Sequence, residues 1–201
     1  MPAFLAVSTD LLLRGVVVMK IPAPLSPASA IPVTDFADPC TRALLANNGT
    51  TTLLLEAALR TSVTVVVQDQ YLQSAGELPP DVGRALQLPG QHRVLVRHSI
   101  LMTPDQRPVS CNRAIIAAPL ESPLSALGDD QHTPLGRTLL SAGIEQHRQV
   151  LTTGHHPWPL TAEFRAAAGK TYLVGIDGRP RLHLTETYNP DLFSADLDPV
   201  T

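Results

Sequence analysis

One stretch of the sequence, Arg93 to Ala117, constrains the fold more than any other. It reads RVLVRHSILMTPDQRPVSCNRAIIA, with two runs rich in β-branched and aliphatic residues on either side of a polar segment that contains proline. Proline and aspartate between two such runs are typical of a turn that joins strands. The stretch therefore predicts a β-hairpin, and with it an antiparallel sheet.

Two arginines in this hairpin predict where a ligand could bind. Side chains alternate along a strand, so Arg97 shares a face with two leucines. A turn centred on Asp105 would pair Arg97 with Arg113. Like charges that face each other across a ladder cost up to ~1 kcal/mol, which favours an anion that neutralises both. Two alternatives remain: each arginine pairs with a carboxylate from another strand, or the register differs by one residue.

Composition excludes several classes of function. The 201 residues are 44% hydrophobic and 16% charged, as expected for one globular, soluble domain. A formal net charge of −3 argues against nucleic acid or an anionic membrane as the main partner. Cys40 and Cys111 are too far apart in sequence to predict a disulfide framework or a metal site, so a reducing cytoplasm is the expected location. Arg14 and Lys20 interrupt the apolar start, which predicts neither a signal peptide nor a membrane span.

Proline divides the chain into an arm and a domain. Residues 21–39 hold five prolines, which exclude a long helix or a central strand. We therefore expect a proline-rich arm over residues 1–39, a domain over residues 40–195 and a short tail over residues 196–201.

Within the domain, hydrophobic periodicity and turn residues predict a mixture of strands and short helices. The expected helices span residues 40–46, 52–60, part of 78–88, and a segment that starts at Pro134 with Thr133 as its N-cap. The expected strands span residues 63–71, the Arg93–Ala117 hairpin, 146–152, and a second hairpin over 169–188 with Asp177 and Gly178 at its turn, while 154–159 and 118–131 read as loops. Strands joined by hairpins, with a few helices on one side, indicate an α+β fold.

Three further features bear on chemistry. The backbone N–H groups at the helix start near Pro134 could receive a carboxylate. Glu186 lies on the apolar face of its strand, where it either pairs with a buried cation or holds a ligand hydroxyl in a pocket. His155 and His156 have no carboxylate or cysteine at ligand spacing, so we interpret them as surface residues and predict no metal site.

Five motifs in order resemble the chorismate pyruvate-lyases. They are ANNGTTT, RVLVRHSILM, CNRAII, TPLGR and DGRPRLHLTETYNPDLF, and the resemblance covers residues 43–193. It implies an α+β fold in which helices cover a ligand buried against an antiparallel sheet. It also implies a carbon–oxygen lyase that needs no cofactor and converts chorismate to 4-hydroxybenzoate and pyruvate, usually for quinone biosynthesis.

The resemblance implies roles for several residues. Arg97 matches the arginine that grips the ring carboxylate. Leu135, in TPLG, matches the residue whose backbone assists that contact. We expect the next residue, Gly136, to bind the substrate as well. Glu186 matches the glutamate that hydrogen-bonds the ring hydroxyl.

Other positions match the family less closely. Arg113 matches a second pocket arginine, expected to hold the enolpyruvyl carboxylate, so that Arg97, Arg113 and Glu186 would form the catalytic set. Thr51 falls where family members often carry a larger apolar residue, which predicts a looser or more polar pocket wall. Lys170 and Thr171 stand where many members carry two basic residues.

The sequence is also compatible with functions other than a lyase. The same fold serves as a ligand-sensing domain in bacterial transcription regulators, where it binds small molecules without chemistry. Such regulators carry a DNA-binding motif ahead of the domain, and the proline-rich start does not predict one. A related enzyme acting on another carboxylate, or a non-catalytic protein that binds an aromatic carboxylate, is also compatible with the sequence. The expected partners are chorismate and 4-hydroxybenzoate, without nucleic acid or membrane, for a monomer or a dimer.

Overall fold

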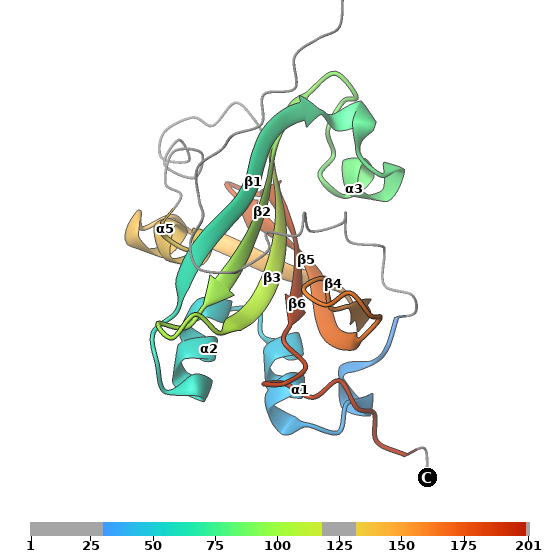
Figure 1. Ribbon diagram of the computed structural model, residues 1–201. Helices are drawn as coiled ribbons and strands as arrows, with labels where there is room; N and C mark the ends of the chain where they lie inside the picture. Colours follow the sequence, from blue (N-terminus) through green and yellow to red (C-terminus); the bar gives the residue numbers. More distant parts are fainter. Residues whose placement is uncertain (1–29, 118–131, 200–201) are drawn as a thin grey trace, which may run out of the picture.

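A six-stranded antiparallel sheet forms the centre of the protein (Figure 1). The computed structural model describes residues 30–117 and 132–199. The strands follow the order β1-β2-β3-β6-β5-β4 across the sheet. Their bounds are β1 Thr64–Ser74, β2 Arg93–Met102, β3 Pro108–Ala117, β4 Gln146–Pro157, β5 Ala166–Ile176 and β6 Arg179–Tyr188. The predicted α+β fold class, with an antiparallel sheet and flanking helices, is confirmed.

Short helices cover both faces of this sheet, so the prediction of helices on one side is wrong. The helices are α1 Pro39–Ala46, α2 Thr51–Leu59, α3 Pro80–Ala85 and α5 Leu135–Ser141, with 3₁₀ turns η1 Val33–Asp35 and η2 Ala75–Glu77. We call the face that packs against α1, α2 and α5 the inner face, and the face that packs against α3 the outer face. In the described parts of the chain, no helix is long and apolar enough to cross a membrane.

Local sequence explains where the inner-face helices begin and end. Asp38 caps α1, because its carboxylate accepts hydrogen bonds from the backbone N–H groups of Cys40 at 3.3 Å and Thr41 at 2.8 Å. Pro39 occupies the first turn, where its missing N–H costs nothing. Arg60 ends α2 in the left-handed conformation. Leu44, Leu45 and other apolar side chains from α1 and α2 then pack on the inner face of the sheet.

The predicted pairing of Arg97 with Arg113 is wrong. The pair next to the β2–β3 turn follows the predicted register, but Val109 is then skipped, and this β-bulge shifts every later pair by one residue. Arg97 therefore pairs with Ala114, and Arg113 pairs with His98. A shift of one residue moves a side chain to the other face of a sheet. Arg97 lies on the inner face and Arg113 on the outer face.

Two smaller expectations also fail. Residues 154–157 continue β4 as a strand instead of starting a loop, because their backbone pairs with the beginning of β5. Helix α5 has Pro134 at its N-cap, one residue later than the predicted Thr133, and no side chain caps it.

Residues 1–29 of the predicted arm and the predicted loop at 118–131 lie outside the described residues. Where the arm is described, the N–H of Ile31 donates to the carbonyl of Thr153 on the edge strand β4 at 2.9 Å.

His156 is buried, contrary to the expectation of a surface residue. It is 2% exposed, and its imidazole packs over Gly169, where an added Cβ would come within 2.5 Å of the ring. Neither ring nitrogen forms a hydrogen bond to any residue that the structure describes. Burial, followed by the neighbouring His155, lowers the pKa of His156 from 6.5 to about 4. The neutral imidazole therefore serves as part of the core.

Acid should destabilise this fold as the pH falls from 6.5 toward 4. Burial, and then the charge of Arg113, also lowers the pKa of His183 to about 4. Because the unfolded chain binds these protons first, the stabilisation is complete above pH 6.5 and is lost as the pH drops. Each histidine accounts for up to about 3 kcal/mol of unfolding free energy. Urea unfolding measured from neutral to acidic pH tests this dependence.

A substitution separates the contribution of one histidine. His156→Leu should remove about half of the pH dependence, whereas His147→Leu, at an exposed position, should leave it unchanged. An unaltered pH dependence in His156→Leu would show that this imidazole does not resist protonation.

Candidate ligand-binding site

A cavity of about 50 Å³ lies on the inner face, between the sheet and helices α2 and α5. A water molecule needs roughly 10–15 Å³ of such space, so the cavity has room for only a few waters. Apolar side chains form much of its wall, and polar groups from α2, β2, β3, β4 and β6 interrupt them. The lining residues are Thr51, Thr52, Val65, Arg97, Ser99, Leu101, Asn112, Ala114, Pro134, Leu135, Gly136, Leu139, Arg148, Tyr172, Val174, Leu182, Leu184 and Glu186.

The five residues predicted to bind substrate all line this cavity. Thr51 comes from α2, Arg97 from β2, Leu135 and Gly136 from α5, and Glu186 from β6. Arg97 is 1% exposed although its side chain is charged. The fold thus brings together residues that are up to 135 positions apart in the sequence. Arg113, also predicted for the catalytic set, does not line the cavity because it lies on the outer face.

Glu186 is held by a buried hydrogen-bond network. One carboxylate oxygen accepts from the hydroxyl of Tyr172 at 2.7 Å and the other from the hydroxyl of Tyr188 at 2.8 Å. The ammonium of Lys170 lies 3.9 Å from the second oxygen. Burial, and then the charge of Glu186, raises the pKa of both tyrosines well above 10, so both phenols remain protonated donors.

Lys170 caps the C-terminal end of α1. Its side chain is 1% exposed, and its ammonium donates to the carbonyl oxygens of Leu44 at 2.7 Å and Asn47 at 2.8 Å. These carbonyls belong to the C-terminal end of α1, where a cation is favoured by the helix dipole. Burial lowers the pKa of Lys170, while the charge of Glu186 opposes that shift. Lys170 thus balances the charge of Glu186 from behind the cavity.

Arg148 contributes a second guanidinium group to the cavity wall. It projects from β4 and is 8% exposed. Its Nη1 donates to the carbonyl of Gly49, and its Nε and Nη2 donate to Oε1 of Gln146 at 3.3 and 3.1 Å. The guanidinium carbon lies 5.9 Å from the centre of the Tyr172 ring. The described lining therefore contains two guanidinium groups and one carboxylate, and Lys170 already offsets that carboxylate.

The sequence analysis did not assign Lys170, Tyr172 or Arg148 to this site, although the first two carry a usable signal. Lys170 and Tyr172 alternate with Val174 along an apolar strand face, the same pattern that identified Glu186. Arg148 follows no such pattern, because its strand is polar and lies at the edge of the sheet. The described residues also contain no cluster of three or more side chains that could hold a metal ion.

Helices α2 and α5 form the cover of the cavity, and an ion pair joins them. The guanidinium of Arg137 on α5 contacts the carboxylate of Glu56 on α2. At Gly136 an added Cβ would lie 3.2 Å from the methyl group of Thr50, so the two helix starts approach closely. The structure therefore presents the cover in a closed position.

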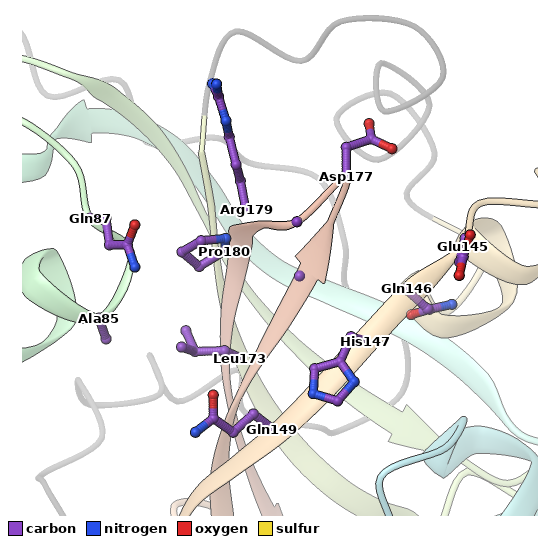
Figure 2. A pocket seen from close by; sticks show the side chains of 12 residues that line it. Ala85, Gln87, Glu145, Gln146, His147, Gln149, Leu173, Asp177, Arg179 and Pro180 are labelled. Atoms are coloured by element: carbon purple, nitrogen blue, oxygen red, sulfur yellow. The ribbon is translucent and has the colours of Figure 1, made fainter.

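A larger groove of about 540 Å³ lies elsewhere, on the outer face (Figure 2). In Figure 2, Gln87 and Ala85 stand across from Leu173, Gln149 and His147. The groove is open and combines amide, acidic and basic side chains. None of the predicted site residues lines it.

Comparisons with known proteins support the fold assignment. The sequence matches no protein-family model and no curated protein. Among solved structures, it is similar to PhnF from Mycobacterium smegmatis, with 15% identity and a TM-score of 0.57 over 74% of this chain and 67% of that chain. The effector domain of PhnF gives 17% identity and a TM-score of 0.54, over 71% of this chain and 90% of that chain. The ligand-binding domain of a GntR-family transcriptional regulator from Bordetella bronchiseptica gives 13% identity and a TM-score of 0.50, over 70% and 91%.

These neighbours correct the expected activity. They include an effector domain and the ligand-binding domain of a GntR-family transcriptional regulator, whereas the resemblance in sequence motifs implied a carbon–oxygen lyase. The prediction that the chain is an enzyme is therefore wrong. The cavity is still lined by Arg97, residues 134–136 and Glu186, and a cavity of this kind can bind a ligand without transforming it.

Without the ion pair between Arg137 and Glu56, the cover formed by α2 and α5 should open more often. Arg137→Gln removes the pair and leaves Glu56 bonded to the N–H of Val63. Because Arg137 is partly exposed, the pair contributes only about 0.2–1 kcal/mol. Amide hydrogen exchange in α2 and α5 should accelerate by about 1.4- to five-fold.

A matched control comes from Arg165, whose ion pair with Asp191 is exposed and lies away from the cover. Arg165→Gln should leave exchange in α2 and α5 unchanged. Equal exchange in Arg137→Gln and the wild type would show that this pair does not hold the cover.

Proposed function

We propose that the inner-face cavity binds a small organic anion and that the chain is a ligand-binding domain of the sensor type. The observation that supports this most is the charge of the wall: Arg97 and Arg148 are both buried there, and Lys170 offsets the one carboxylate among the described lining residues. Charges attract each other more strongly on a buried wall than in water, so two guanidinium groups there favour an anion. A ligand carboxylate could accept charge-assisted hydrogen bonds from them.

The rest of the wall favours a ligand with an apolar body. Leu101, Leu182 and Leu184 offer apolar surface between the polar groups. Ligand sites commonly combine such surface with a few polar groups that fix the orientation. An aromatic or similarly compact carboxylate suits this wall better than an inorganic anion, which has no apolar surface to bury.

Glu186 suits a hydroxyl on the same ligand. Each of its oxygens accepts one phenol hydrogen bond, and a carboxylate oxygen can accept a second. The two tyrosines fix the direction of the carboxylate, so a ligand hydroxyl would find its acceptor already in place. A phenol or alcohol opposite the ligand carboxylate is the expected partner of Glu186.

The similar structures support a binding role. The chain covers 90% of the PhnF effector domain and 67% of the whole PhnF chain, so it corresponds mainly to the effector domain. The Bordetella structure is itself described as a ligand-binding domain. An aromatic ligand needs more than the 50 Å³ present, so α2 and α5 would have to lie farther from the sheet when it is bound.

Calorimetric titration with 4-hydroxybenzoate tests the proposal. The wild type should bind it saturably, and 4-hydroxybenzyl alcohol, which lacks the carboxylate, should bind far more weakly. Arg97→Gln should weaken binding of 4-hydroxybenzoate by about 10-fold or more, because a charge-assisted hydrogen bond is lost. Arg165→Gln, with its exposed ion pair, should bind like the wild type. Equal binding of the acid and the alcohol, or wild-type affinity in Arg97→Gln, would contradict an anion site at this wall.

A further inference from the structure

Arg148 is anchored on one side and exposes donors on the other. A guanidinium group carries five N–H bonds, and three of them are used, two toward Gln146 and one toward Gly49. One N–H on each of Nη1 and Nη2 remains for another acceptor. Nη2 lies 3.4 Å from the position that a Cβ on Gly136 would occupy, so it faces the space below the start of α5.

The partners of Arg148 are neutral. The oxygens that accept from it are a backbone carbonyl and a side-chain amide, and no described carboxylate lies within ion-pair distance of it. The nearest acid on the cavity wall, Glu186, is already engaged by Tyr172, Tyr188 and Lys170. A buried guanidinium group with neutral partners is a strong local attractor for an anion in the cavity.

The anchored side of Arg148 fixes the connection between α1 and α2. Gly49 lies in that connection, residues 47–50, and leads directly into α2. Its N–H donates to the side chain of Asn47 at 2.9 Å, and the carbonyl of Asn47 accepts from Lys170. Lys170 therefore secures the first half of the connection and Arg148 the second half. Thr51, which starts α2, lines the cavity.

We infer that Arg148 links occupation of the cavity to the order of the α1–α2 connection. This inference rests on the proposed function, because it requires an anion in the cavity. The anion takes the remaining N–H bonds of Arg148, which restricts the guanidinium group and strengthens its hold on the carbonyl of Gly49. The start of α2 then opens less often when ligand is bound, and the cover closes over the ligand.

Hydrogen exchange with and without saturating 4-hydroxybenzoate tests this link in the full chain. In the wild type, ligand should slow exchange several-fold in peptides that span residues 47–55, and leave α3 on the outer face unchanged. Arg148→Gln should still bind the ligand through Arg97, about 10-fold more weakly. At saturation it should lose the protection at residues 47–55. Arg165→Gln should show the same protection as the wild type.

A second variant keeps the test valid if Arg148→Gln does not fold. Arg148→Lys keeps the charge but lacks the planar fork that reaches an anion and Gly49 together, so it should bind the ligand and show reduced protection. Full protection in either folded variant would overturn the role of Arg148 and leave the proposed function standing. Absence of binding in the wild type would instead overturn the proposed function, and this inference with it.

Discussion

The buried ammonium of Lys170 is the interaction on which the site depends. It joins three parts of the fold, because it donates to two carbonyls at the end of α1, projects from β5 and lies 3.9 Å from Glu186 on β6. A cation that is 1% exposed must have such partners, since burying it alone would cost several kcal/mol. The α1–α2 connection is thereby held against the sheet, and α2 can cover the cavity.

The two faces of the sheet differ in what they can bind. On the inner face, the charge of Glu186 is balanced by Lys170, and Arg97 and Arg148 stand among apolar side chains. On the outer face, α3 packs on an apolar cluster, and the open groove in Figure 2 mixes acidic, basic and amide groups without a consistent charge. Within residues 30–117 and 132–199, only the inner face combines burial, an excess of positive charge and an apolar wall, which is the combination that an organic anion requires.

Much of this arrangement could be predicted from local patterns. Alternation along the strands, turn residues and proline positions identified the hairpins and most of the helices, because these signals act over a few residues. The same alternation placed Arg97 and Glu186 on apolar strand faces. The site residues beyond them came from resemblance to a family, and the resemblance carried an activity that the structural neighbours contradict.

The remaining features depend on long-range geometry. The bulge at Val109 leaves no mark in the sequence, yet it moves Arg113 to the opposite face. Arg148 lies on a polar edge strand, and it joins the site only because the sheet and α2 come together around it.

A structure of the protein with bound 4-hydroxybenzoate tests the central claim most directly. The account predicts the ligand on the inner face, with its carboxylate within hydrogen-bond distance of Arg97; a ligand bound in the outer groove would contradict it.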